Sequence, residues 1–536
     1  MVVMRLVTLP ALAAATVLAL SGCTNPAGQD AGESGAAPTG SAAASTPAAD
    51  STASGAPGAV SAEDRQRASD IVAKMDDDEL AGSVIMADYQ GTDSAAGAKL
   101  VKDNHLAGII VMGYNLSQSP TADEVKKTTG ALREAAGDRG WATAISVDQE
   151  GGPVARLGDA ATRFPPLMAA GAADKPKITQ AATRAQGAEL RDLGFTADFA
   201  PDADVTIGKR DAAINVRSAG SSPALVARTA AAAVHGYRAG GIASSAKHYP
   251  GHGALETDSH KSLPTSKKSL AQMKKRDLVP FRATTKAGAP MVLVGHIGLP
   301  GSGTAPASLN PKVYASLRKD TGFDGVAVTD ALNMGAISES PGQETVKAIR
   351  AGADLALMPP DPAAAVRAVR TALGSGDLTK ARVTQAAERV VAMQLWQQRA
   401  SVAAQAHPAE GDKAFTDLAD ASLTVLKGTC RVKKPAAAIS VSGGEEAART
   451  ALLKAAEDEG LRTGSGTTVS LSPQGSAQVV VGTGGPWRVA GASAQTVLNT
   501  YSDNPHAMRA VAKYLAGTLT AGAKAPVKTA GSPPAC

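Results

Sequence analysis

Residues 247–260 combine a lysine, three histidines and an aspartate in one short stretch. The stretch begins Lys-His-Tyr-Pro-Gly-His-Gly and ends in Asp258-Ser259-His260. Proline and glycine do not sustain a regular helix, so we expect the end of a strand followed by an irregular loop. Asp258 precedes His260 by two residues, which allows its carboxylate to hold one imidazole nitrogen and raise the basicity of the ring. The pair predicts a general acid/base, and the alternative for His260 is a solvated loop side chain.

Asp330 is the candidate nucleophile to work with such an acid/base. It ends Val326-Ala-Val-Thr-Asp, an apolar run that would deliver its carboxylate to one end of a sheet. A carboxylate there can attack the anomeric carbon of a sugar and form a covalent intermediate, while an acid/base protonates the leaving oxygen and then activates water. The alternative is that Asp330 caps the next helix. Most glycosidases use a second carboxylic acid in place of an imidazole, so a His/Asp pair would be unusual.

A further polar group can bind hydroxyls. Asp148 begins Asp-Gln-Glu-Gly-Gly at the end of another apolar run, and its carboxylate can accept hydrogen bonds from a sugar. Arg156 and Arg217 can donate to other hydroxyls. The alternative is that the glycines form a plain turn and the two arginines form surface ion pairs.

Three histidines in the 247–260 stretch raise the question of a metal site. His248 and His252 have the i, i+4 spacing of zinc ligands on a helix, and His260 follows them. Pro250-Gly251 stands between the first two and prevents that helical arrangement. We therefore expect no metal, and no other cofactor.

Eight short apolar runs alternate with helical stretches between residues 62 and 395. Most runs are continuously apolar, as expected for a parallel sheet that is buried on both faces. This count and alternation predict a (β/α)8 TIM barrel, with a doubly wound open sheet as the alternative. The runs are 83–88, 108–113, 142–148, 195–202, 243–249, 291–296, 325–330 and 355–359.

Polar residues recur where these runs end. In a barrel, the carboxyl ends of the strands carry the active site. Five of the runs end at or near such side chains, which supports the barrel independently of the apolar pattern. The residues are Asp148, Asp202, Lys247 with His248, His296 and Asp330.

The remainder of the chain predicts a second, smaller domain. A helical stretch over 362–393, broken at 377–379, would close the barrel, and 396–420 is expected to be a connector. Residues 421–536 alternate again between helices and strands, which predicts an α/β sandwich-like domain. It has few clustered ionisable residues, so we expect it to support the fold or the substrate rim.

The N-terminus predicts export. Residues 1–23 contain Arg5, an apolar run and Leu-Ser-Gly-Cys23, which resembles a bacterial lipobox; the alternative is an ordinary secretory signal. Residues 24–61 are small and polar, as in a disordered linker. We expect a lipid anchor at Cys23 that holds the protein on the extracytoplasmic face of the cell membrane. In an exported chain Cys430 and Cys536 are expected to form a disulfide rather than two free thiols.

The 247–253 pattern followed by Asp258-Ser259-His260 resembles the signature of glycoside hydrolase family 3, and specifically of its β-N-acetylglucosaminidase branch. The blocks 148–152 and 328–334 are similar to two further family blocks in the same order. The resemblance covers about residues 62–395 and extends weakly over the last domain. The sequence departs from the family pattern at Pro153 and at Asn215-Val216, and both departures concern the sugar-binding rim.

The resemblance implies a retaining hydrolase that removes terminal β-linked N-acetylglucosamine from small wall-derived glycans such as muropeptides. Asp330 would be its nucleophile and His260, with its partner Asp258, its acid/base. No metal is implied. The residues implied to hold the sugar are Asp148, Arg156, Arg217, Lys247 and His248.

Other functions stay open from the sequence. A phosphorylase is one, because a histidine acid/base repels an incoming phosphate less than a carboxylate would. Another family 3 β-glycosidase is a second, and a wall-glycan-binding lipoprotein without activity is a third. The net charge of +5 is spread along the chain and does not support nucleic-acid binding, and we expect a monomer.

Overall fold

A computed structural model describes residues 59–404, 409–473, 477–529 and 536. The predicted signal peptide, the lipidation site Cys23 and most of the predicted linker 24–61 lie outside these residues. Within the described ranges, no helix has the length and apolar character needed to span a membrane.

Eight parallel strands form the first sheet, in the order β7-β6-β5-β4-β3-β2-β1-β8. A bridge between Val328 and Leu355 brings β7 beside β8, so the sheet is nearly closed. The strands lie within the predicted apolar runs, and the prediction of a (β/α)8 barrel is confirmed. They are β1 Ile85–Ala87, β2 Gly108–Ile110, β3 Ala144–Val147, β4 Ala197–Asp198, β5 Ala243–Tyr249, β6 Met291–Val294, β7 Val326–Thr329 and β8 Ala356–Leu357.

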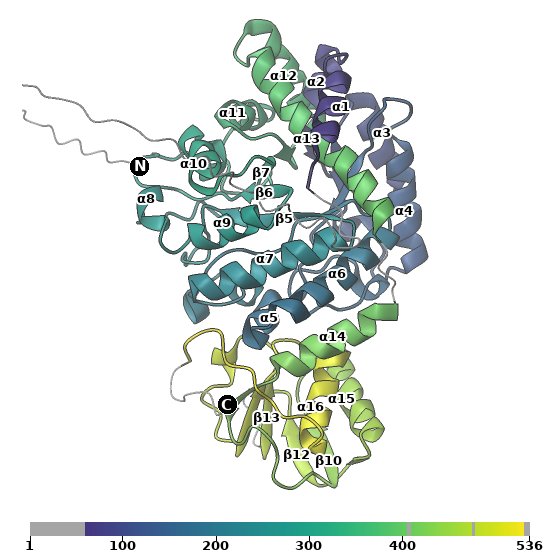
Figure 1. Ribbon diagram of the computed structural model, residues 1–536, viewed down its shortest axis with the longest axis vertical. Helices are drawn as coiled ribbons and strands as arrows, with labels where there is room; N and C mark the ends of the chain where they lie inside the picture. The colour runs from purple at the N-terminus through teal and green to yellow at the C-terminus, as the bar shows by residue number, and fades with distance from the viewer. Residues whose placement is uncertain (1–58, 405–408, 474–476, 530–535) are drawn as a thin grey trace, which may run out of the picture. The chain divides into compact units, whose positions relative to one another are not determined.

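Helices cover the outside of this barrel (Figure 1). Because only 3% of the residues are aromatic, the core is built from small and aliphatic side chains that allow close packing. At Gly236 a Cβ atom would lie 1.9 Å from the Thr183 hydroxyl, so α6 and α7 can approach closely only without a side chain there. The helices are α1 Ala62–Val72, α2 Asp77–Gly82, α3 Ser94–Asn104, α4 Ala122–Glu134, α5 Leu167–Ala173, α6 Pro176–Asp192, α7 Pro223–Ala239, α8 Leu270–Met273, α9 Leu278–Lys286, α10 Pro311–Thr321, α11 Gln343–Ala351, α12 Pro362–Ser375 and α13 Lys380–Ala403.

The predicted connector 396–420 differs from what the structure contains. α13 continues past residue 395 to Ala403, and α14 Ala409–Ser422 occupies most of the remaining connector. Trp396 and Ala400 are buried in the same apolar cluster as residues of the barrel strands. The apolar face of α13 therefore extends the barrel beyond the predicted boundary at 395.

The second domain contains a six-stranded sheet in the order β11-β10-β12-β13-β14-β9, in which only β9 is antiparallel. Helices α15 Glu446–Asp458 and α16 Pro505–Ala516 lie side by side against it (Figure 1). A disulfide joins Cys430 to Cys536. The strands are β9 Thr424–Lys427, β10 Ala438–Ser442, β11 Arg462–Thr463, β12 Thr467–Ser470, β13 Val479–Gly482 and β14 Thr496–Asn499.

The loop after β14 and the segment after α16 contact the loops of the barrel. The Asn504 side-chain amide donates to the Arg163 carbonyl over 2.7 Å, and the Ser221 N–H donates to the Pro526 carbonyl over 3.0 Å. Tyr501 packs in an apolar cluster with Met168 of α5. These contacts fix the segment after β14 beside the carboxyl ends of β3 and β4.

Candidate active site

The carboxyl ends of the barrel strands surround a cavity of about 170 Å³. Every predicted catalytic and sugar-binding residue lines it except Asp258, which is hydrogen-bonded to His260. Asp202 and His296, which the sequence also placed at strand ends, do not line it. The cavity thus collects side chains from segments that are far apart in the chain. The predicted residues that line it are Asp148, Arg156, Arg217, Lys247, His248, His260 and Asp330.

Asp330 directly follows β7, and its backbone is fixed by a hydrogen bond from its N–H to the Val294 carbonyl (2.9 Å). One carboxylate oxygen accepts from the Ala331 N–H over 2.9 Å. Burial alone would raise the pKa of Asp330, but the nearby His296 ring, the Ala331 N–H and the Lys247 ammonium outweigh it, so the pKa lies below its usual range. The carboxylate is therefore ionised, as a nucleophile must be.

Asp258 and His260 form a pair at the edge of the cavity. The Asp258 carboxylate accepts from Nδ1 of His260 over 2.8 Å and from the His260 backbone N–H over 3.0 Å. Because Nδ1 is engaged, Nε2 is the ring nitrogen that remains for proton exchange. The His260 side chain is 70% exposed, so this nitrogen is accessible to a leaving group and to water.

Glu150 is a site residue that the sequence did not single out. Arg217 donates to both Glu150 oxygens, from Nε over 2.9 Å and from Nη2 over 2.8 Å. The Lys247 ammonium lies 2.8 Å from Glu150 and 2.6 Å from Asp148. Burial would raise the pKa of Glu150, but Arg217 and Lys247 together hold it well below its usual range. The available signal in the sequence was that Glu150 lies two residues after Asp148, in a chain that also offered Lys247 and Arg217 as candidate cations.

His248 connects this network to a second buried carboxylate, Asp204. Its Nδ1 lies 2.7 Å from Asp204, and its Nε2 lies 3.2 Å from Nη2 of Arg217. Since arginine only donates, Nε2 must accept and Nδ1 must carry the hydrogen. His248 is thereby held as one neutral tautomer. Asp204, which fixes it, was not among the predicted residues.

Asp202, Asp204 and His248 present ligand atoms within 4.8 Å of one another. Burial and the charge of Asp204 hold the pKa of Asp202 well above its usual range, which disfavours the ionised form that a metal ligand needs. Asp204 and His248 already satisfy each other, and the Arg217 guanidinium lies against the ring. This donor set fits a hydrogen-bonded pair better than a cation, and the absence of a metal stays a prediction.

Two further histidines differ in position. His296 is fully buried; its Nδ1 lies 2.7 Å from the Ser308 hydroxyl, and its Nε2 lies 2.8 Å from the Ala331 carbonyl. It therefore fixes the chain next to Asp330. His252 lines the cavity, and neither of its ring nitrogens has a hydrogen-bond partner among the described residues. Burial lowers the pKa of His252 to about 4.

Residues 78–393 match the family model of the glycosyl hydrolase family 3 N-terminal domain. The chain belongs to glycosyl hydrolase family 3. The predicted family of glycoside hydrolases is thereby confirmed.

Relatives of this family 3 chain carry hexosaminidase names. Beta-hexosaminidase A of Pseudoalteromonas piscicida is 34% identical over 284 residues, which span 49% of this chain and 47% of that protein. Beta-hexosaminidase LpqI of Mycobacterium tuberculosis is 34% identical over 323 residues, 56% of this chain and 79% of the relative. The chain thus spans about half the length of the first relative and most of the second.

A solved structure is similar over both domains. It is a glycoside hydrolase family 3 beta-N-acetylglucosaminidase from Paenibacillus sp. str. FPU-7, with a TM-score of 0.74 and 26% sequence identity. The match covers 85% of this chain and 99% of that one. The second domain of this family 3 protein is therefore part of the shared fold.

Proposed function

We propose that the protein is a β-N-acetylhexosaminidase that hydrolyses terminal β-linked N-acetylglucosamine from small glycans. The observation that carries this proposal is that Asp330 and the Asp258-held His260 line one cavity together with five predicted sugar-binding residues. The hexosaminidase names of the relatives support the choice of sugar.

The proposed reaction proceeds in two displacements with retention of configuration. In the first, the Asp330 carboxylate attacks the anomeric carbon while the glycosidic bond breaks and Nε2 of His260 gives its proton to the leaving oxygen. In the second, water attacks the glycosyl–Asp330 ester, gives its proton to His260 and releases the sugar. Asp258 stabilises the imidazolium that gives the first proton and that forms again when His260 takes a proton from water.

Sugar hydroxyls are assigned to the paired network on the other side of the cavity. Asp148 and Glu150 offer acceptors, and Lys247, Arg156 and Arg217 offer donors. Because Glu150, Arg217 and Lys247 already hold one another, they need little rearrangement when the sugar arrives. This preorganisation is what a specific terminal subsite needs.

Turnover of nitrophenyl β-glycosides tests the substrate. We expect the N-acetylglucosaminide to be cleaved in preference to the glucoside and the xyloside, with the β-anomer of the free sugar appearing first by NMR. A preference for the plain glucoside would overturn the choice of sugar, and initial release of the α-anomer would overturn the retaining mechanism.

Phosphorolysis is the second candidate, because the proposed acid/base is an imidazole rather than a carboxylate. An imidazole repels an incoming phosphate dianion less, so phosphate could replace water in the second displacement. The two reactions separate when turnover is measured with and without phosphate. Strong acceleration accompanied by a sugar 1-phosphate would replace the hydrolase by a phosphorylase.

We also propose that the protein works on wall-derived glycans while anchored by lipid at Cys23. The apolar run and Leu-Ser-Gly-Cys23 in residues 1–23 support this location. Detergent-phase partitioning of the full chain and of Cys23→Ala tests it. The parent is expected in the detergent phase and the variant in the aqueous phase, and equal partitioning would contradict the anchor.

A further inference from the structure

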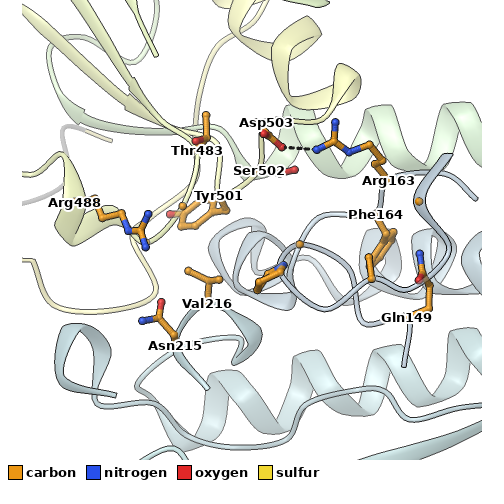
Figure 2. Close-up of a pocket in the computed structure, with 16 residues that line it drawn as sticks. Gln149, Arg163, Phe164, Asn215, Val216, Thr483, Arg488, Tyr501, Ser502 and Asp503 are labelled. Carbon is orange, nitrogen blue, oxygen red and sulfur yellow. Dashed lines mark hydrogen bonds and ion pairs between the residues drawn. The ribbon is translucent and has the colours of Figure 1, made fainter. Parts of the chain in front are cut away.

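A second cavity, of about 270 Å³, lies beside the active site. It is lined by barrel loops and by the loops that follow β13 and β14 of the second domain (Figure 2). The carboxyl ends of parallel strands are the usual place for ligands in α/β sheets, and here those of two sheets face the same space.

The two cavities share their walls. Pro153 and Ala155 line the second cavity, whereas the adjacent Val154 and Arg156 line the active-site cavity. In the segment 213–217, Asn215 and Val216 line the second cavity, whereas Arg217 lines the active-site cavity. These two backbone segments thus lie between a ligand in the second cavity and the sugar-binding residues.

The second cavity has one positive charge without a partner. Arg163 is paired with Asp503 over 3.1 Å, as Figure 2 shows, so their charges balance. Arg488 also lines the cavity and is exposed, and its guanidinium has no hydrogen bond or ion pair with any other described residue. An unpaired guanidinium suits a carboxylate, which it can bind with two parallel hydrogen bonds.

The backbone around this cavity is also unusual. Two of the described non-glycine residues with positive φ, His105 and Asp174, end helices, and Met358 lines the active-site cavity. The other two are Asn215 (φ 52°) and Tyr501 (φ 63°), and both line the second cavity. Such conformations in non-glycine residues concentrate at functional sites, where the surroundings enforce them.

Tyr501 is held in place from both sides. Its hydroxyl lies 2.8 Å from the Thr424 hydroxyl, and its ring belongs to the apolar cluster that contains Met168. In Figure 2, Arg488 lies beside Tyr501, with Asn215 and Val216 across from it. The guanidinium thus lies next to a fixed wall.

We propose that the second cavity is a leaving-side subsite in which Arg488 binds a carboxylate on the leaving portion of the substrate. This inference rests on the proposed glycosidase function. The terminal sugar occupies the active-site cavity. The leaving portion extends past Gly152 and Pro153 into the second cavity. The second domain then contributes to selectivity and not to bond cleavage.

The test compares two leaving groups that differ by one charge. The substrates are N-acetylglucosaminyl-β-1,4-N-acetylmuramic acid, whose leaving sugar carries a lactyl carboxylate, and its methyl ester. In Arg488→Ala, kcat/KM for the acid is expected to fall roughly tenfold, as for the loss of one hydrogen-bonded charge contact. The ester and the nitrophenyl N-acetylglucosaminide are expected to change less than about twofold.

Arg462→Ala is the matched control, because Arg462 is an exposed arginine on β11, at the edge of the sheet away from β13. It should leave the acid-to-ester ratio unchanged. Equal losses for acid and ester in Arg488→Ala, or no loss for either, would overturn the subsite. A parent protein that cleaves none of the three substrates would instead overturn the proposed function.

Discussion

The two cavities on either side of the 148–156 segment differ in how their charges are balanced. In the active-site cavity, Lys247 is buried, Arg217 is mostly so, and both are paired with acidic residues, Asp148 and Glu150. In the second cavity, Arg488 is exposed and unpaired among the described residues. A buried charge must be compensated by a partner within the protein, whereas an exposed charge is stabilised by water until a ligand binds it. The first arrangement suits a fixed sugar and the second a variable group.

Replacing Asp330 should cause the largest loss of activity of any substitution in the active-site cavity. In Asp330→Ala the proposed nucleophile is absent, so kcat for the nitrophenyl N-acetylglucosaminide should fall roughly 10⁴- to 10⁶-fold. Unfolding by urea, followed by circular dichroism, checks that the variant is folded. A folded variant with the parent's kcat would remove Asp330 from the mechanism.

Replacing His260 should have the next largest effect. His260→Ala removes the proton donor, and kcat should fall by about 10²- to 10⁴-fold for a substrate with a sugar leaving group. A dinitrophenyl leaving group needs no protonation and should be much less affected in the first displacement, which a burst of the phenol in stopped-flow measurements would report. An equal fold-loss in the first displacement for the dinitrophenyl substrate and for the substrate with a sugar leaving group would contradict an acid role.

Glu150→Gln removes the negative charge of Glu150 and replaces one of its two acceptor oxygens by an amide donor, while the size of the side chain is nearly unchanged. It leaves Arg217 and Lys247 buried with one negative charge fewer, and the free energy of unfolding should fall by about 3 kcal/mol. Urea denaturation measures this change, and Glu256→Gln, at an exposed position, is the control. A stability equal to that of the parent would mean that the pairs are not mutually dependent.

Asp198 is a buried carboxyl in the barrel that should make the stability of the protein depend on pH. It is a fully buried carboxyl with one oxygen unpartnered among the described residues, and burial raises its pKa to about 8. Between its ordinary pKa and that value the folded state holds a proton that the unfolded state releases, so stability falls as pH rises. Asp198→Asn lacks this titration. The free energy of unfolding of the variant, relative to that of the parent, should therefore increase by about 2 kcal/mol as the pH rises from 5 to 7. Parallel stability curves for the two proteins would contradict this.

The sequence predicts the barrel well because each strand is a local apolar run that ends in a polar side chain. Asp330 and Lys247 could be found in this way, since a barrel brings such ends together. The partners of these residues could not. Glu150 and Arg217 meet across 67 positions of the chain, and His248 and Asp204 across 44, and only the fold decides which acid meets which base.

The second domain was harder to predict than the barrel. The sequence predicted only an alternation of helices and strands there, and β9, β10 and β11 are short strands that each include at least one exposed residue. The second cavity had only a partial sequence signal, because Pro153 and Asn215-Val216, where the sequence departs from the family pattern, line it. Arg488 and Asn215 are far apart in the chain, and nothing local marks them as neighbours.

The alternation along residues 153–156 has a consequence for how such an enzyme can diversify. Pro153 and Ala155 face one cavity, while Val154 and Arg156 face the other. Substitutions at positions 153 and 155 would therefore change the second cavity, and substitutions at positions 154 and 156 would change the active-site cavity. Substrate range can drift in small steps while the bond-breaking apparatus on the reverse side is inherited intact.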